Sequence, residues 1–80
     1  AHSKPAPDIF LAAAEGVGAD IRRCIGIEDA AAGVAAIKAA GALPIGVGKA
    51  EDLGSDIALV SGTAELTYAY LQNVWAQSGR

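Results

Sequence analysis

The sequence predicts an α/β domain with a mostly parallel sheet, and three observations support that class. Segments with helical patterning alternate with short apolar segments along the chain. Two of the short segments, residues 24–27 and 57–60, contain no polar side chain other than a cysteine, which is typical of parallel strands covered by helices on both faces. With 80 residues, the chain is at most one domain, so these elements belong to a single sheet.

The first predicted helix lies within residues 7–18, with Gly16 or Gly18 as its terminator. Pro7 suits the first turn of a helix, because its fixed φ angle is helical and its missing N–H group would have no partner there. Phe10, Ala14 and Val17 recur at helical spacing, which predicts one apolar face.

The middle of the chain predicts a strand, a helix and a second strand. Residues 23–27 fit a short buried strand. Residues 30–41 are rich in alanine and fit a helix that ends at Gly41, with Val34 and Ile37 as its apolar stripe. Residues 43–48 then fit the next strand.

The last third predicts a loop, a strand and a closing helix. The loop covers residues 49–56, the strand 57–60 and the helix 64–77, with Ser61 or Thr63 as the N-cap. This helix is expected to be the longest of the chain. Its apolar residues at helical spacing indicate a core or interface face; they are Tyr68, Leu71 and Trp75.

Composition excludes several classes of partner. The net charge is −3 and the six basic residues are scattered, so nucleic acid is not expected as a ligand. Cys24 is the single cysteine, which excludes an internal disulfide and a cysteine-based metal cage. No apolar run approaches about 18 residues and no signal peptide is apparent. We therefore expect a cytoplasmic protein with no membrane partner.

Glu28 and Asp29 are adjacent carboxylates that directly follow the first predicted strand. Ligands of open α/β sheets bind just beyond the carboxyl ends of the strands. Mg²⁺ suits one or two protein carboxylates completed by water and phosphate oxygens, and a divalent ion would remove the repulsion between the two charges. The alternative, of about equal weight on the chemistry alone, is that Asp29 caps the following helix while Glu28 points to solvent.

Lys4 lies between Ser3 and Pro5, in a segment stiffened by prolines at positions 5 and 7. An ammonium group presented in this way can contact a phosphate oxygen or a carboxylate nucleophile, and Ser3 can contact the same phosphate. The alternative is a solvated lysine beside an ordinary loop serine, which the residues taken alone favour.

Three segments carry a resemblance to a known family. They are "SKPAPDIFLAAAEGVG", "CIGIEDAAAGVAAIKAAGALPIGVG" and "EDLG". Together they resemble the C-terminal part of the haloacid dehalogenase (HAD) superfamily, most closely its β-phosphoglucomutase branch. The resemblance implies that residues 1–80 are a partial HAD-type, Rossmann-like core without the first strand and the cap domain. It also implies that Glu28 and Asp29 hold a catalytic Mg²⁺, while Lys4 is catalytic and binds phosphate together with Ser3.

The implied activity interconverts β-glucose 1-phosphate and glucose 6-phosphate through an aspartyl-phosphate. The motif D-x-D-G, which supplies the nucleophile in this family, does not occur here, so we expect the chain alone to be inactive. The expected partners are a sugar phosphate in the full-length protein and either the missing N-terminal part of the fold or a complementing chain. The alternatives are a HAD sugar-phosphate phosphatase and a non-catalytic half-domain that pairs with another chain.

Overall fold

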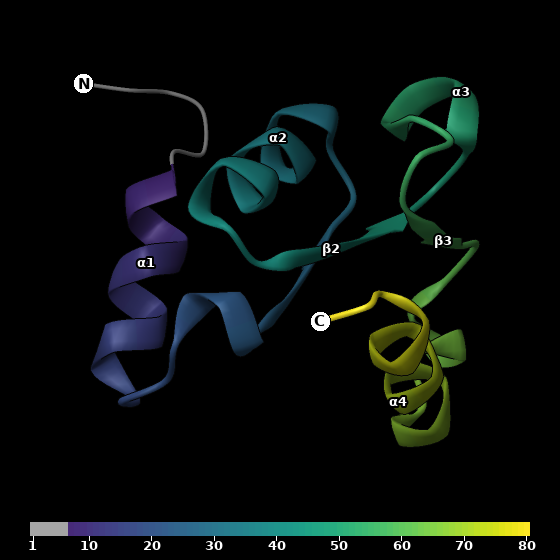
Figure 1. Cartoon of the computed structure of the whole chain (residues 1–80). Coiled ribbons are helices and arrows are strands. Elements are labelled where there is room, and N and C mark those ends of the chain that lie inside the picture. Colours follow the sequence, from purple (N-terminus) through teal and green to yellow (C-terminus); the bar gives the residue numbers. More distant parts are fainter. Residues whose placement is uncertain (1–6) are drawn as a thin grey trace.

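The protein, described here from a computed structural model, contains a three-stranded parallel sheet with helices on both faces (Figure 1). The structure describes residues 7–80. The α-helices and strands are α1 (Pro7–Gly16), β1 (Ile25–Glu28), α2 (Ala31–Ala40), β2 (Leu43–Val47), α3 (Ala50–Leu53), β3 (Ala58–Val60) and α4 (Tyr68–Gln77). Two 3₁₀ turns, Ile21–Arg23 and Thr63–Glu65, precede β1 and α4. The predicted α/β class with parallel strands is confirmed.

The sheet has the order β1-β2-β3, so β2 is its centre. β1 pairs with β2 from Ile25 opposite Leu43, and β2 pairs with β3 from Ile45 opposite Ala58. Both pairings are parallel, and α2 and α3 provide the connections that parallel strands need. As a result, the carboxyl ends of the three strands meet at one edge of the sheet and their amino ends at the other.

The core lies between the sheet and α2. Ile37 on α2 and Ile45 on β2 are fully buried, and burying each side chain contributes about 1.5–3 kcal/mol. Gly26 on β1 allows this close packing, because a Cβ atom there would lie 2.7 Å from Cγ2 of Ile37. Val34 is also buried, so the predicted apolar stripe of this helix is confirmed.

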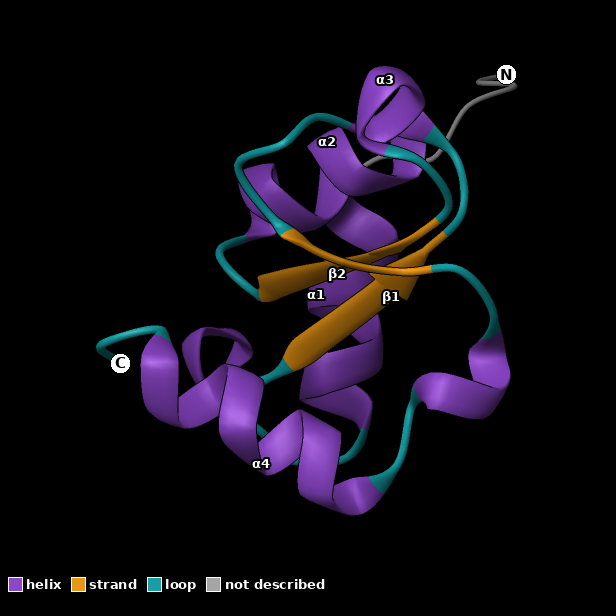
Figure 2. Ribbon diagram, turned by 90° about the vertical axis from the view of Figure 1, so that its right-hand side faces the viewer, coloured by secondary structure: helices purple, strands orange, loops and turns teal. Residues whose placement is uncertain are grey.

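Figures 1 and 2 place α4 on the side of the sheet opposite α2, whereas α1 packs against α2. α2 ends at Gly41 as predicted, with the left-handed φ of 98° that glycine adopts without strain. α4 buries none of its residues completely, and Tyr68 is 76% exposed. Leu71 and Trp75 are half-buried, so the predicted apolar face of this helix packs only in part.

Several sequence-based boundaries were wrong. α1 ends at Gly16, the earlier of its two predicted terminators, but Val17 is 80% exposed instead of sharing the apolar face with Ala14 and the half-buried Phe10. The predicted loop over residues 49–56 contains the short helix α3. α4 begins at Tyr68 and has ten residues, as α1 and α2 do, so it is not the longest helix.

The late start of α4 has a local cause in the carboxylate of Glu65. Its Oε2 atom accepts the hydroxyl and the backbone N–H of Ser61, at 2.5 and 2.8 Å, and the backbone N–H of Gly62 at 3.0 Å. These bonds close a separate 3₁₀ turn. Thr67 then caps α4 by accepting the N–H of Tyr70 at 3.1 Å, in place of the predicted Ser61 or Thr63.

None of the helices within residues 7–80 is long and apolar enough to cross a membrane.

Candidate functional site

Glu28 and Asp29 lie at the edge of the sheet where the strands have their carboxyl ends. Glu28 is the last residue of β1, and Asp29 begins the short turn into α2. Asp29 is exposed and Glu28 is half-buried. Both carboxylates therefore stand where open α/β sheets bind their ligands, as the sequence predicts.

The side chain of Glu28 is held in place by its surroundings. Its Oε1 atom accepts the backbone N–H of Asp29 at 3.0 Å. The rest of the side chain lies over Gly33. If Gly33 carried a Cβ atom, the three atoms nearest to it would be Cγ, Cδ and Oε2 of Glu28. Gly33 is buried in the first turn of α2, and its missing side chain leaves the space that Glu28 occupies.

The alternative in which Asp29 caps α2 is wrong. The N-cap residue is Ala30, and no side chain makes a capping hydrogen bond there. The carboxylate of Asp29 makes no hydrogen bond or ion pair with any side chain or backbone group of residues 7–80. It is thus available to a ligand.

A shallow pocket of about 220 Å³ joins this edge, lined by the ends of β1 and β2 and by the 3₁₀ turn that follows β3. The lining residues are Ile27, Glu28, Asp29, Val47 and Thr63. Thr63 was considered only as a helix cap in the sequence. The signal that could have placed it here is its position three residues after β3, since parallel strands end at a common edge.

The donor set fits a magnesium ion. Carboxylate and hydroxyl oxygens are hard ligands, and Mg²⁺ keeps several waters while binding one or two protein carboxylates and phosphate oxygens. Within residues 7–80 no group of three or more His, Cys, Asp or Glu side chains could form a closed metal cage. Glu28 and Asp29 would therefore hold the ion at an open site. The predicted phosphate-binding residues Ser3 and Lys4 lie outside the described residues.

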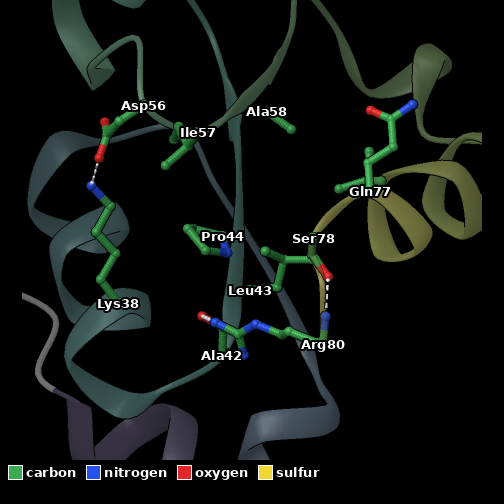
Figure 3. Close-up of a pocket in the computed structure, with 11 residues that line it drawn as sticks. Lys38, Ala42, Leu43, Pro44, Asp56, Ile57, Ala58, Gln77, Ser78 and Arg80 are labelled. Atoms are coloured by element: carbon green, nitrogen blue, oxygen red, sulfur yellow. Dashed lines mark hydrogen bonds and ion pairs between the residues drawn. The ribbon is translucent and has the colours of Figure 1, made fainter.

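Larger pockets lie at the opposite edge of the sheet. One of about 510 Å³ opens beside the start of β2, at Leu43 and Pro44, and Figure 3 shows the side chains around it. Lys38 donates to Asp56 across 2.6 Å, and this hydrogen bond, with the lysine charge, lowers the pKa of the Asp56 carboxyl. This pocket shares no lining residue with the smaller pocket at Glu28 and Asp29. Pocket volume alone would therefore not have identified the predicted metal site.

Comparisons with known proteins agree with this fold. A family model described as a haloacid dehalogenase-like hydrolase matches residues 1–41, just over half of the chain. Over 78 residues the chain is 45% identical to β-phosphoglucomutase of Bacillus subtilis. The matched region covers 96% of this chain and 34% of that protein. The chain thus spans about a third of the length of this relative.

Solved structures extend the likeness. A crystal structure of β-phosphoglucomutase from Clostridium difficile superposes with a TM-score of 0.86 at 39% identity, over 95% of this chain and 34% of that one. A HAD hydrolase of family IA from Entamoeba histolytica superposes with a TM-score of 0.74 at 30% identity, over 92% of this chain and 36% of that one. The chain belongs to the haloacid dehalogenase-like hydrolase family.

Proposed function

We propose that this chain supplies the metal-holding carboxylates and the phosphate-balancing lysine of a Mg²⁺-dependent phosphotransferase that acts on a sugar phosphate. The observation that carries the proposal is the placement of Glu28 and Asp29 at the carboxyl edge of the sheet, with Glu28 held over Gly33. The 45% identity to a β-phosphoglucomutase supports interconversion of β-glucose 1-phosphate and glucose 6-phosphate.

Each residue has a distinct part in this proposal. Glu28 is kept in one orientation by the N–H of Asp29, so its free oxygen Oε2 can serve as a fixed ligand. Asp29 is exposed and supplies the second ligand. Lys4 offsets the negative charge of the phosphoryl group, and Ser3 binds a phosphate oxygen. Mg²⁺, when bound, supplies electrostatic stabilisation of the phosphoryl oxygens.

The nucleophile must come from outside this sequence, because no D-x-D-G segment occurs in it. Phosphoryl transfer needs an in-line nucleophile and exclusion of water, which two ligands and a lysine do not provide. The proposed partners are therefore the remaining part of the fold and a sugar phosphate. On its own, the chain is expected to be inactive.

A chimera tests the proposal directly. In it, this chain replaces the matching third of the Bacillus subtilis β-phosphoglucomutase, and conversion of β-glucose 1-phosphate to glucose 6-phosphate is followed with a coupled dehydrogenase. We expect Mg²⁺-dependent turnover. Glu28→Gln and Asp29→Asn should each lower kcat/KM at least about 100-fold and raise the Mg²⁺ concentration needed for half-maximal rate.

Glu15→Gln is the matched control, since Glu15 is an exposed carboxylate of α1 that does not line the Glu28–Asp29 pocket. It should leave kcat/KM unchanged within about twofold. Wild-type turnover in the Glu28 and Asp29 variants would refute the metal assignment. An inactive chimera that is folded would refute the catalytic proposal and favour the non-catalytic half-domain.

A sugar-phosphate phosphatase is the second candidate. The family model and the Entamoeba histolytica structure are both described as hydrolases. In a phosphatase, water accepts the phosphoryl group, whereas in a mutase the sugar does. The same carboxylates and lysine serve both reactions, so the product distinguishes them: inorganic phosphate for the phosphatase and glucose 6-phosphate for the mutase.

A further inference from the structure

The three arginines of the chain gather around one pocket at the amino edge of the sheet. This pocket of about 580 Å³ is lined by Arg22, Arg23, Gly41, Trp75 and Arg80. Arg22 and Arg23 directly precede β1, and Gly41 lies two residues before β2. The pocket thus lies at the end of the sheet opposite Glu28 and Asp29. No aspartate or glutamate lines it.

Among the residues that the structure describes, no carboxylate forms an ion pair with these guanidinium groups. The ion pairs found among residues 7–80 join Lys38 to Asp56 and Lys49 to Glu51, and none includes an arginine. The nearby Asp20 uses its carboxylate to accept the backbone N–H of Arg22 at 3.0 Å, which caps the 3₁₀ turn. A protein with a net charge of −3 therefore leaves three like charges unpaired around one pocket, an arrangement that an anion would stabilise.

Arg80 is already oriented by the fold. Its Nη1 atom donates to the carbonyl oxygens of Arg22 and Gly41, at 3.1 and 2.7 Å, and its Nη2 atom donates to that of Ala42 at 3.5 Å. Figure 3 shows this guanidinium group beside Ala42. A guanidinium group has five N–H donors, so three bonds leave donors free for a ligand while the side chain stays fixed. The acceptors carry no formal charge, so within residues 7–80 these bonds do not neutralise Arg80 as a carboxylate would.

Gly41 and Trp75 shape the rest of the pocket. Gly41 lines the pocket beside Arg22, and a Cβ atom at Gly41 would lie 3.9 Å from Cγ of Arg22, an ordinary contact distance. Trp75 is half-buried and also lines the neighbouring pocket with Arg23. Its indole ring adds an N–H donor and an aromatic face to the three guanidinium groups.

We propose that this arginine pocket (Arg22, Arg23 and Arg80 around Gly41 and Trp75) binds the oligophosphate group of a small molecule. Planar guanidinium groups bind phosphate oxygens in bidentate fashion. Several guanidinium groups suit a ligand with several adjoining phosphates better than a ligand with a single carboxylate. The pocket volume of about 580 Å³ lies in the size range of small-molecule sites, which favours a small molecule over an extended acidic segment. The ligand is an inorganic oligophosphate or the phosphate tail of a nucleotide.

Trp75 is the only tryptophan of the chain, so its fluorescence reports on ligands that bind around this residue, which lines both this pocket and its neighbour. The 80-residue chain is titrated with inorganic tripolyphosphate, ATP, AMP and adenosine in EDTA, so that no metal ion links the ligand to Glu28 and Asp29. We expect saturable changes with tripolyphosphate and ATP, and much weaker binding of AMP and adenosine. Equal affinities for tripolyphosphate and ATP would show that the phosphates are sufficient for binding. A higher affinity for ATP than for tripolyphosphate would identify a nucleotide as the ligand.

Arg23→Gln is the test variant, because the Arg23 side chain makes no hydrogen bond within the described part of the chain. It should weaken tripolyphosphate binding about tenfold or more. Lys49→Gln removes the same charge from an exposed side chain outside the pocket and should change binding less than about twofold. If circular dichroism shows that Arg23→Gln is unfolded, Arg22→Gln replaces it with the same expectation.

Four results would overturn the proposal. They are the absence of saturable tripolyphosphate binding, equal weakening by the Lys49 and arginine variants, adenosine binding as tight as that of ATP, and a polyglutamate peptide that binds more tightly than tripolyphosphate. The last result would assign the pocket to an acidic protein segment.

Discussion

Replacing Gly33 by alanine places a methyl group where the Glu28 side chain lies. The three atoms nearest to the new Cβ would be Cγ, Cδ and Oε2 of Glu28, and the contact with Cγ is too close to persist. Cγ is near the backbone, so Glu28 must rotate away as a whole instead of bending at its tip. This rotation would break its bond with the N–H of Asp29 and remove a carboxylate from the candidate metal site.

The expected stability change is a balance of two opposing terms. Alanine in a helix is favoured over glycine by about 0.5–1 kcal/mol. Crowding of a packed site costs about 1–3 kcal/mol, a range that includes the lost Glu28 hydrogen bond of about 1 kcal/mol. We therefore expect Gly33→Ala to destabilise the protein by about 0–2.5 kcal/mol.

Urea unfolding followed by far-ultraviolet circular dichroism measures this balance, with two controls. Gly16→Ala lies at the end of α1, where a Cβ would meet nothing within 4 Å, so it should stabilise by up to about 1 kcal/mol. Gly33→Ala combined with Glu28→Ala removes the colliding atoms. In that background, the Gly33 change should become stabilising by about 0.5–1 kcal/mol.

The reasoning fails if Gly33→Ala alone stabilises the protein as much as Gly16→Ala does. The Glu28 side chain would then not lie over Gly33. It also fails if the effect of Gly33→Ala is the same with glutamate or alanine at position 28, because the cost would then come from another contact.

Two further predictions concern the core and the 3₁₀ turn before α4. Ile37→Ala removes a fully buried side chain and should cost about 2–5 kcal/mol in urea unfolding, and a cost below about 1 kcal/mol would contradict the described core. Hydrogen bonds from the Ser61 hydroxyl, and then from the backbone N–H groups of Ser61 and Gly62, lower the pKa of Glu65 below its ordinary 4.5. The folded state thus binds this proton less readily than the unfolded state, so the stabilisation is present above pH 4.5 and is lost as the pH falls through the folded pKa. Melting temperatures between pH 7 and 3 should therefore fall less steeply for Glu65→Gln, and identical profiles would refute this role.

The centre of the fold could be predicted because its signals are local. Val34 and Ile37 stand at helical spacing, Gly41 offers the left-handed end of α2, and the flanking strands are continuous apolar runs. The same local reading located Glu28 and Asp29, because carboxylates after a buried parallel strand stand at the ligand edge. These predictions needed no information about distant residues.

The remaining features depend on contacts between distant segments. Thr63 reaches the carboxylate pocket only because β3 pairs in parallel with β2. The exposure of Val17 follows from where α1 ends and what packs there, which helical spacing does not encode. The arginine pocket brings Arg22 and Arg80 together across 58 residues, although the sequence shows them only as scattered charges.

The hydrogen bonds of Arg80 also have a consequence for the order of folding. The carbonyl oxygens that it contacts belong to Arg22, Gly41 and Ala42, and they converge only after β1 and β2 have paired and α2 has ended. Bringing Arg80 to these distant residues closes long loops, which costs conformational entropy. The contacts of α4 offset little of this cost, because this helix buries no residue completely. We therefore expect α4 to dock after the transition state and to detach before global unfolding, so that its amide hydrogens exchange faster than those of α2.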